Sequence, residues 1–263
     1  MTPSASAGQA ARRSSPGNGV TATRTVGLEP TIVAIGGGGL GSEPESRLLD
    51  DYLLGLTGKP APKVCFLPTA SGDAVDYIVR FYSNFTVDRC QPSHLPLIFR
   101  TMADIRDHIL AQDMIYVGGG NTAAMLAIWR QHGVDQILHE AWDRGIVLCG
   151  ASAGANCWFE ACSTDSFGPS LAPLNDGLGF LAGSFCPHYD GEVNRRPTLG
   201  RFLDSRELPA GYACDNYSGL RFEGTQLAEA IASKDTARAY RVQLGAGGFQ
   251  ETEIVPRYLG PTT

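Results

Sequence analysis

Short, uninterrupted apolar runs separated by amphipathic segments constrain the fold of this chain more than any other feature. The runs span residues 31–35, 63–68, 94–99, 113–119, 145–150 and 183–189. They lack polar–apolar alternation, so they are typical of parallel strands that are buried on both faces. Intervening segments, such as NTAAMLAIWRQHG at 121–133, have helical periodicity and end at glycine. This order predicts a doubly wound α/β fold with a mostly parallel sheet.

The two ends of the chain differ from this pattern. After residue 210 short runs are separated by turn residues, which predicts antiparallel C-terminal additions to the sheet. Nothing divides residues 26–260, so we predict a single domain there. Residues 1–25 are rich in Ser, Thr, Ala and Gly and predict a disordered tail, with an organellar transit peptide as the alternative.

Composition excludes several classes of function. The formal net charge of −6 disfavours binding to nucleic acid or to an anionic membrane surface. No apolar run reaches the roughly 18 residues that a membrane span needs. The seven cysteines form no C-x-x-C pair, so we expect buried, reduced thiols in a cytoplasmic protein, with no metal and no cofactor.

A glycine- and alanine-rich motif supplies the candidate nucleophile. The stretch CGASAGANCWF, residues 149–159, places Ser152 in a G-x-S-x-G pattern between an apolar run and a helical segment. In that context a sharp strand-to-helix turn exposes the serine hydroxyl at the carboxyl end of the strand. The Ala153 N–H, which opens the helix, is placed to donate to an oxyanion. The alternative is that Ser152 only caps the helix.

Two glycine-rich stretches also follow predicted strands. GGGGLG at 36–41 formally matches a dinucleotide-binding G-x-G-x-x-G, but the second predicted strand ends in LPTASG, without an acid for the ribose. We therefore interpret GGGGLG as a tight turn near a ligand site rather than as a site for NAD. YVGGGNT at 116–122 precedes a helix, so its amides are suited to stabilising an anion, unless the glycines only permit a turn.

His188 is the candidate general base. It ends a predicted strand in FCPHYD and is the only one of the five histidines that follows Ser152. A triad acid between Ser152 and His188 would have little room, so the order Ser, His, acid is favoured. That order differs from the Ser, acid, His order of α/β-hydrolases. A core or surface histidine is the alternative.

Taken together, VGGGNT, GASAGA and PHYD resemble the peptidase E and cyanophycinase family of serine peptidases, over nearly the whole chain after the tail. The likeness is greatest to peptidase E, an aspartyl dipeptidase. It implies a fold like that of class I glutamine amidotransferases, with Ser152 as nucleophile and His188 as base. It also implies an oxyanion hole formed by the amides of Gly120 and Ala153, and a role for Asn121 in holding the substrate.

The resemblance further implies an arginine downstream of the histidine that binds the acidic side chain of the substrate. Arg196, in VNRRPTLGRF, is the first candidate and Arg195 the second. Bidentate binding of a carboxylate suits the guanidinium group. The alternative is an arginine that faces solvent on a helix.

The third triad member is where this chain departs from the usual glutamate of the family. The matching position in GYACDNYSGLRF is Asn216, beside Asp215. A carboxylate both orients the histidine and stabilises its cation, whereas an asparagine only orients it. We therefore predict Asp215 as the third member, with Asn216 and then Glu223 as alternatives.

The predicted function is serine-type hydrolysis of short peptides, including dipeptides with an N-terminal aspartate. Two alternatives remain at this point: a cyanophycinase-type hydrolase of β-aspartyl peptides, and an inactive relative that only binds. The sequence does not fix the oligomeric state.

Overall fold

A computed structural model describes Met1 and residues 29–41 and 43–261, so the predicted tail lies, apart from Met1, outside the described residues. A 3-10 turn covers Thr69–Ser71. The helices are α1 (Pro44–Leu56), α2 (Val75–Asn84), α3 (Ile105–Leu110), α4 (Thr122–His132), α5 (Val134–Asp143), α6 (Ala153–Asn156) and α7 (Arg195–Asp204).

The strands form two sheets. The first contains β1 (Thr31–Ile35), β2 (Lys63–Leu67), β3 (Gln91–His94), β4 (Met114–Val117), β5 (Val147–Ala151), β10 (Ser218–Glu223), β11 (Gln226–Ala232) and β14 (Arg257–Tyr258). Its order is β14-β11-β10-β1-β5-β4-β2-β3. The five strands from β1 to β3 in this order are parallel, and β10 pairs antiparallel with β1.

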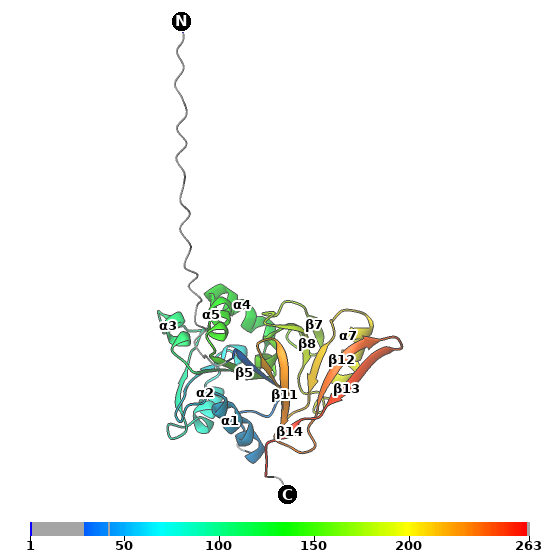
Figure 1. The fold of residues 1–263 in the computed structure, drawn as a ribbon, viewed down its shortest axis with the longest axis horizontal. Coiled ribbons are helices and arrows are strands. Elements are labelled where there is room, and N and C mark those ends of the chain that lie inside the picture. The colour runs from blue at the N-terminus through cyan, green and yellow to red at the C-terminus, as the bar shows by residue number, and fades with distance from the viewer. Residues whose placement is uncertain (2–28, 42, 262–263) are drawn as a thin grey trace.

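The second sheet contains β6 (Phe159–Thr164), β7 (Ala172–Leu174), β8 (Leu181–Cys186), β9 (Gly211–Cys214), β12 (Ala239–Gly245) and β13 (Gly248–Ile254). Its order is β13-β12-β9-β8-β6-β7. β6, β8 and β9 are parallel, and the other pairings are antiparallel. In Figure 1 the hairpin of β12 and β13 lies with α7 at the end of the molecule away from α2 and α3.

The fold prediction is therefore confirmed in part: the chain is α/β, but its two sheets are mixed and only partly parallel. The run at 183–189 contributes β8 to the second sheet rather than to the first. The strand predicted at 94–99 is wrong, because β3 covers Gln91–His94. The backbone leaves the sheet after that strand: the amides of Leu97 and Ile98 donate to the Asp73 carboxylate, at 2.7 Å each.

Helices cover both faces of the first sheet (Figure 1). Successive strand residues point to opposite faces, so Val33 packs in the core with α1 and α2, and Ile32 in the core with α3, α4 and α5. This two-sided burial explains the unbroken apolar runs. Each fully buried aliphatic side chain contributes about 1.5–3 kcal/mol to folding.

Two features of this topology position the candidate site. Parallel strands β1, β4 and β5 end at the same edge of the first sheet, so the segments that follow them meet there. The chain also passes between the sheets four times, and the first two of these passages, after β5 at Ser152 and after β9 at residues 215–217, contribute to the site.

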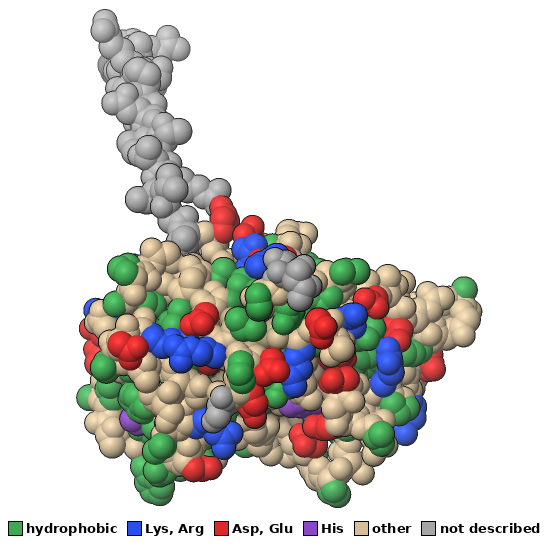
Figure 2. All heavy atoms as spheres, turned by 90° about the horizontal axis from the view of Figure 1, so that it is seen from below, with side chains coloured by type: hydrophobic (Ala, Val, Ile, Leu, Met, Phe, Trp, Pro, Cys, Tyr) green, Lys and Arg blue, Asp and Glu red, His purple; other side chains and the backbone are tan. Residues whose placement is uncertain are grey.

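Charged side chains of both signs lie interspersed on the face shown in Figure 2. Ion pairs also join neighbouring strands of the first sheet, such as Glu229 with Arg221 and Arg257. This face carries no basic patch of the kind that nucleic-acid binding requires.

Candidate active site

Ser152 lies on a strained turn between β5 and α6. Its φ and ψ are 58° and −116°, a conformation that a non-glycine residue adopts rarely and mostly at functional sites. The flanking glycines permit close packing there: a Cβ on Gly154 would lie 2.2 Å from the Val117 carbonyl oxygen, and one on Gly150 would lie 2.5 Å from the Gly154 carbonyl oxygen. The local geometry is that of a nucleophile elbow.

His188 lies between Ser152 and an asparagine. Its Nε2 is 2.9 Å from the Ser152 Oγ, and its Nδ1 is 2.7 Å from the Asn216 Oδ1. Because an amide oxygen only accepts, Nδ1 must carry the proton. In the neutral ring Nε2 then accepts from the serine hydroxyl. The structure thus brings the predicted nucleophile and base into contact.

The partner of His188 is Asn216 rather than Asp215, our first choice. Asp215 is 5% exposed, and its Oδ2 accepts the Arg238 N–H at 2.9 Å. Its Oδ1 has no hydrogen-bond partner among the described residues, and burial raises the pKa of this carboxyl to about 6. The Asp215 side chain therefore binds the backbone of Arg238, and the side chain of the next residue, Asn216, bonds to the histidine.

Glu223 does not reach the histidine either. It ends β10 and pairs in register with Thr31, at the start of β1, which is the opposite edge of the sheet from Ser152. Its carboxylate forms an ion pair with Arg221. By contrast, Asp190, which sequence reasoning missed, accepts the Asn216 backbone N–H at 2.8 Å.

The glycine-rich loop at 36–41 forms a wall behind His188 and Asn216. A Cβ on Gly37 would lie 2.1 Å from the Asn216 Oδ1 and 2.7 Å from the His188 Nδ1. The Gly36 carbonyl accepts the His188 N–H at 3.1 Å, and the Gly37 carbonyl accepts the Tyr217 N–H at 2.8 Å. The glycine run that formally resembled a dinucleotide motif thus makes room for the histidine and its partner.

The second glycine-rich loop, residues 118–120, lies beside the nucleophile. A Cβ on Gly119 would be 3.4 Å from the Ser152 Cβ, and the Gly119 N–H donates to the Tyr77 hydroxyl at 3.1 Å. Neither the Gly120 nor the Ala153 N–H donates a hydrogen bond within residues 29–41 and 43–261. Both amides remain free to bind an oxyanion.

Asn121 was predicted to hold substrate, yet both ends of its side-chain amide are engaged within the protein. Its Oδ1 caps α4 by accepting the Ala124 N–H at 2.8 Å, and its Nδ2 donates to the Ser166 carbonyl at 2.9 Å. The geometry makes Asn121 the N-cap of α4, directly after residues 118–120.

Arg196, the predicted carboxylate-binding residue, is already paired. Its guanidinium forms a two-pronged ion pair with Glu251, with Nε 3.0 Å from Oε2. The Tyr189 and Tyr240 rings pack against the guanidinium, whose Cζ lies 5.0 and 5.1 Å from the two ring centroids. Tyr189 also donates its hydroxyl to Glu251 at 2.6 Å.

Arg195, the second candidate, is 3% exposed. Its Nε donates to Glu192 at 2.7 Å, and another guanidinium nitrogen donates to the Ser163 carbonyl at 3.1 Å. Neither arginine therefore offers a free guanidinium to a substrate in this structure.

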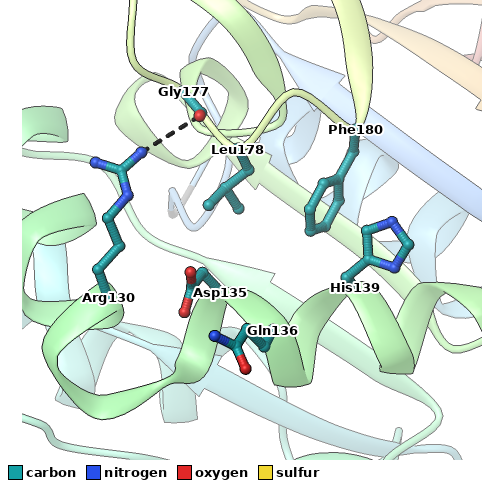
Figure 3. A pocket seen from close by; sticks show the side chains of 7 residues that line it. All are labelled: Arg130, Asp135, Gln136, His139, Gly177, Leu178 and Phe180. Carbon is teal, nitrogen blue, oxygen red and sulfur yellow. Dashed lines mark hydrogen bonds between the residues drawn. The ribbon is translucent and has the colours of Figure 1, made fainter.

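A separate pocket of about 390 Å³ lies at the far end of α4 from Asn121 (Figure 3). Its lining residues are Arg130, Asp135, Gln136, His139, Gly177, Leu178 and Phe180. Figure 3 shows the Arg130 guanidinium turned toward the Gly177 carbonyl rather than toward Asp135. Neither Ser152 nor His188 lines this pocket, so it is distinct from the candidate active site.

The described residues include no group of three or more His, Cys, Asp or Glu side chains placed to hold a metal ion. Among the helices that the structure describes, none has the length and apolarity to cross a membrane.

Comparison with known proteins gives the family. Residues 32–230 match peptidase family S51. The chain belongs to peptidase family S51. It is 47% identical over 229 residues to "Uncharacterized peptidase YgaJ" of Bacillus subtilis (strain 168), which covers 87% of this chain and 99% of that protein. It is 29% identical over 139 residues to "Peptidase E" of Streptomyces coelicolor, covering 49% of this chain and 56% of that protein.

Solved structures support the fold of this S51 member. A peptidase from an acI-B1 Actinobacterium aligns with a TM-score of 0.60 at 17% identity, covering 87% of this chain and 95% of that one. A putative peptidase E protein from Listeria monocytogenes EGD-e aligns with a TM-score of 0.57 at 17% identity, covering 77% and 98%. The resemblance seen in the sequence is confirmed: the chain is a family S51 peptidase related to peptidase E.

Proposed function

We propose that this S51 member hydrolyses short peptides, with Ser152 as nucleophile, His188 as general base and Asn216 as the residue that orients the histidine. One observation carries the proposal: the imidazole is hydrogen-bonded to the serine hydroxyl at 2.9 Å on one side and to the Asn216 amide oxygen at 2.7 Å on the other. The first distance lets the imidazole take the serine proton, and the second lets the amide hold the ring in place.

The mechanism follows from these contacts. His188 Nε2 takes the Ser152 proton while Oγ attacks the peptide carbonyl carbon, and the carbonyl oxygen becomes an oxyanion. The free N–H groups of Gly120 and Ala153 stabilise that charge. The imidazolium then protonates the departing amine, and water hydrolyses the acyl-enzyme with His188 again as base.

Asn216 makes this site different from a triad with a carboxylate. A neutral amide fixes the tautomer and the ring orientation, but it has no negative charge to stabilise the imidazolium cation. The Asp190 carboxylate accepts the Asn216 backbone N–H and does not bond to the ring. We therefore assign Asn216 an orienting role only.

Preference for an N-terminal aspartate is the finer question. A substrate carboxylate would have to compete with Glu251 for the Arg196 guanidinium. Two guanidinium nitrogens and the Tyr189 hydroxyl already donate hydrogen bonds to the Glu251 carboxylate. We propose that the enzyme does not require an acidic N-terminal residue, and that such a preference strengthens when Glu251 loses its charge.

Labelling with a fluorophosphonate probe tests the catalytic assignment. We expect wild-type protein to be labelled and Ser152→Ala to be unlabelled, while Ser205→Ala, at the end of α7, labels like wild type. Absence of labelling in folded wild-type protein would show an inactive relative and reject the proposal.

A peptide panel tests the substrate class. Asp-X, β-Asp-Arg and neutral dipeptides are compared at equal concentration for wild type and Glu251→Gln. We expect neutral dipeptides to be cleaved by wild type and the Asp-X rate to rise relative to them in Glu251→Gln. Cleavage of Asp-X alone by wild type would contradict the proposed breadth, and cleavage of β-Asp-Arg alone would favour the cyanophycinase-type alternative.

A further inference from the structure

The loop at 36–41 contacts the catalytic residues on one side and α1 on the other. On the catalytic side, Gly36 and Gly37 accept the backbone N–H groups of His188 and Tyr217. On the α1 side, the Ser46 hydroxyl donates to the Gly38 carbonyl at 2.5 Å. Ser46 is fully buried, so this bond is protected from competition by water.

Asp50, one turn further along α1, is a buried carboxyl that the catalytic mechanism does not use. It is fully buried, and neither carboxylate oxygen completes a hydrogen bond with a described group. Burial raises the pKa of this carboxyl to about 7, and the Arg89 charge and then the Leu40 amide lower it by smaller amounts. Leu40 is itself buried, with a φ of 55°, so the loop makes a left-handed turn at this residue.

Tyr116 supports the same loop from below. Its hydroxyl is buried without a partner among the described residues, and a Cβ on Gly39 would lie 2.2 Å from it. The loop therefore has no room to move toward the sheet. Its position relative to the catalytic side depends on the polar contacts from α1.

We propose that Ser46 and Asp50 are positioning residues that hold the loop at 36–41 against His188 and Asn216, a role that rests on the catalytic functions proposed above. The Ser46 hydroxyl fixes the Gly38 carbonyl, and the buried Asp50 carboxyl lies one turn further along the same helix. Loss of either polar group lets Gly36 and Gly37 shift. A displacement of about 1 Å at a catalytic group lowers the rate by about 10²-fold.

Variants on one helix test this role. Ser46→Ala removes the hydroxyl, and Asp50→Leu replaces the carboxyl by an apolar side chain of similar shape. Asp50→Asn is the conservative variant, because an amide keeps a donor and an acceptor. Asp51→Asn is the matched control: its side chain is 55% exposed and is paired with Arg89.

We expect kcat to fall about 10-fold or more in Ser46→Ala and Asp50→Leu with KM within twofold, and to recover in Asp50→Asn. Asp51→Asn should match wild type. Unchanged kcat in folded Ser46→Ala would overturn the proposal. If Asp50→Leu fails to fold, Ser46→Ala and Asp50→Asn still decide the question.

Amide hydrogen exchange separates this proposal from the proposed function. The His188 and Tyr217 N–H groups are bonded to Gly36 and Gly37, so both should exchange faster in Ser46→Ala, whether or not the wild type cleaves peptides. Equal exchange in the variant and the wild type would reject the positioning role. An inactive wild type would reject only the proposed function.

Discussion

The two glycine-rich loops at the carboxyl edge of the first sheet serve the candidate site in different ways. In the loop at 36–41, glycine leaves space: the side chains of His188 and Asn216 occupy the volume that a Cβ on Gly37 would need. In residues 118–120, glycine allows a backbone conformation: Gly120 has a φ of 136° and leaves its N–H without an acceptor among the described residues. One loop positions the base, and the other presents a donor beside the nucleophile.

The largest expected effect tests the first loop. In Gly37→Ala the added methyl group would clash with the His188 and Asn216 side chains, so the hydrogen bonds from Asn216 through His188 to Ser152 cannot form. We expect kcat/KM to fall about 10³-fold, measured on a neutral dipeptide. Gly55→Ala is the control, because a Cβ at this position in α1 meets nothing within 4 Å. Wild-type rates in folded Gly37→Ala would show that the loop does not confine the base.

The groups beneath the two loops differ in their titration. Burial raises the pKa of Asp50, under the first loop, to about 7, whereas burial raises the pKa of Tyr77, beside the second, above its ordinary value of 10.0. A raised carboxyl pKa means that the folded state binds the proton more tightly, so the contribution of Asp50 to stability is fully present below about pH 4 and is lost as pH rises through 7. We expect a loss of a few kcal/mol across this range, since each pKa unit corresponds to about 1.4 kcal/mol.

Denaturant unfolding at several pH values measures this dependence. Asp50→Asn cannot ionise, so its stability should fall less between pH 4 and 8 than that of wild type. Asp215, whose pKa is raised to about 6 by burial, leaves a residual dependence in the variant. Parallel curves for the two proteins would show that Asp50 ionises at the same pH in the folded and unfolded states, so that burial does not raise its pKa.

A smaller effect concerns the partner of the base. Asn216→Ala removes the acceptor for His188 Nδ1, and we expect kcat to fall about 10²-fold. Asn216→Asp restores an acceptor and adds a charge for the imidazolium, so its rate should equal or exceed that of wild type. Asp215→Asn should change kcat less than threefold. A larger loss in Asp215→Asn than in Asn216→Ala would return the role to Asp215.

The smallest effect tests the second loop. Tyr77→Phe removes the acceptor of the Gly119 N–H, which costs about 1 kcal/mol and loosens the segment beside Ser152. We expect kcat to fall about fivefold with little change in KM. Tyr82→Phe, on the same helix and bonded to His94, is the control. Equal kcat values in the two variants would mean that Gly119 needs no support from Tyr77.

The sequence predicts Ser152 and His188 because each depends on local signals. A nucleophile on a sharp turn requires small flanking residues, and His188 is identified by the predicted strand directly before it in FCPHYD. The second sheet could not be predicted in this way. Its pairings join β9 with β8 and β12, and the apolar run of β8 would suit a strand of either sheet.

The choice between Asp215 and Asn216 required the structure. Chemical preference favoured the carboxylate, but side-chain direction decided the outcome. Tyr217 has a φ of 65°, and Asp215 is turned to the Arg238 N–H, so only the amide points at His188. A shift of one residue at a strand end reverses which side chain faces the site, and no local pattern reports that shift.

Because Ser152 follows a strand of the first sheet and His188 follows a strand of the second, the distance between their side chains measures how the two sheets are docked. A small movement of one sheet along the other would separate the Ser152 Oγ from the His188 Nε2 without breaking any hydrogen bond between strands within either sheet. Peptide hydrolysis would then disappear at denaturant or pressure levels at which the circular dichroism is still native. The rate of peptide hydrolysis would therefore report a change in the relative position of the two sheets before any spectroscopic signal of unfolding.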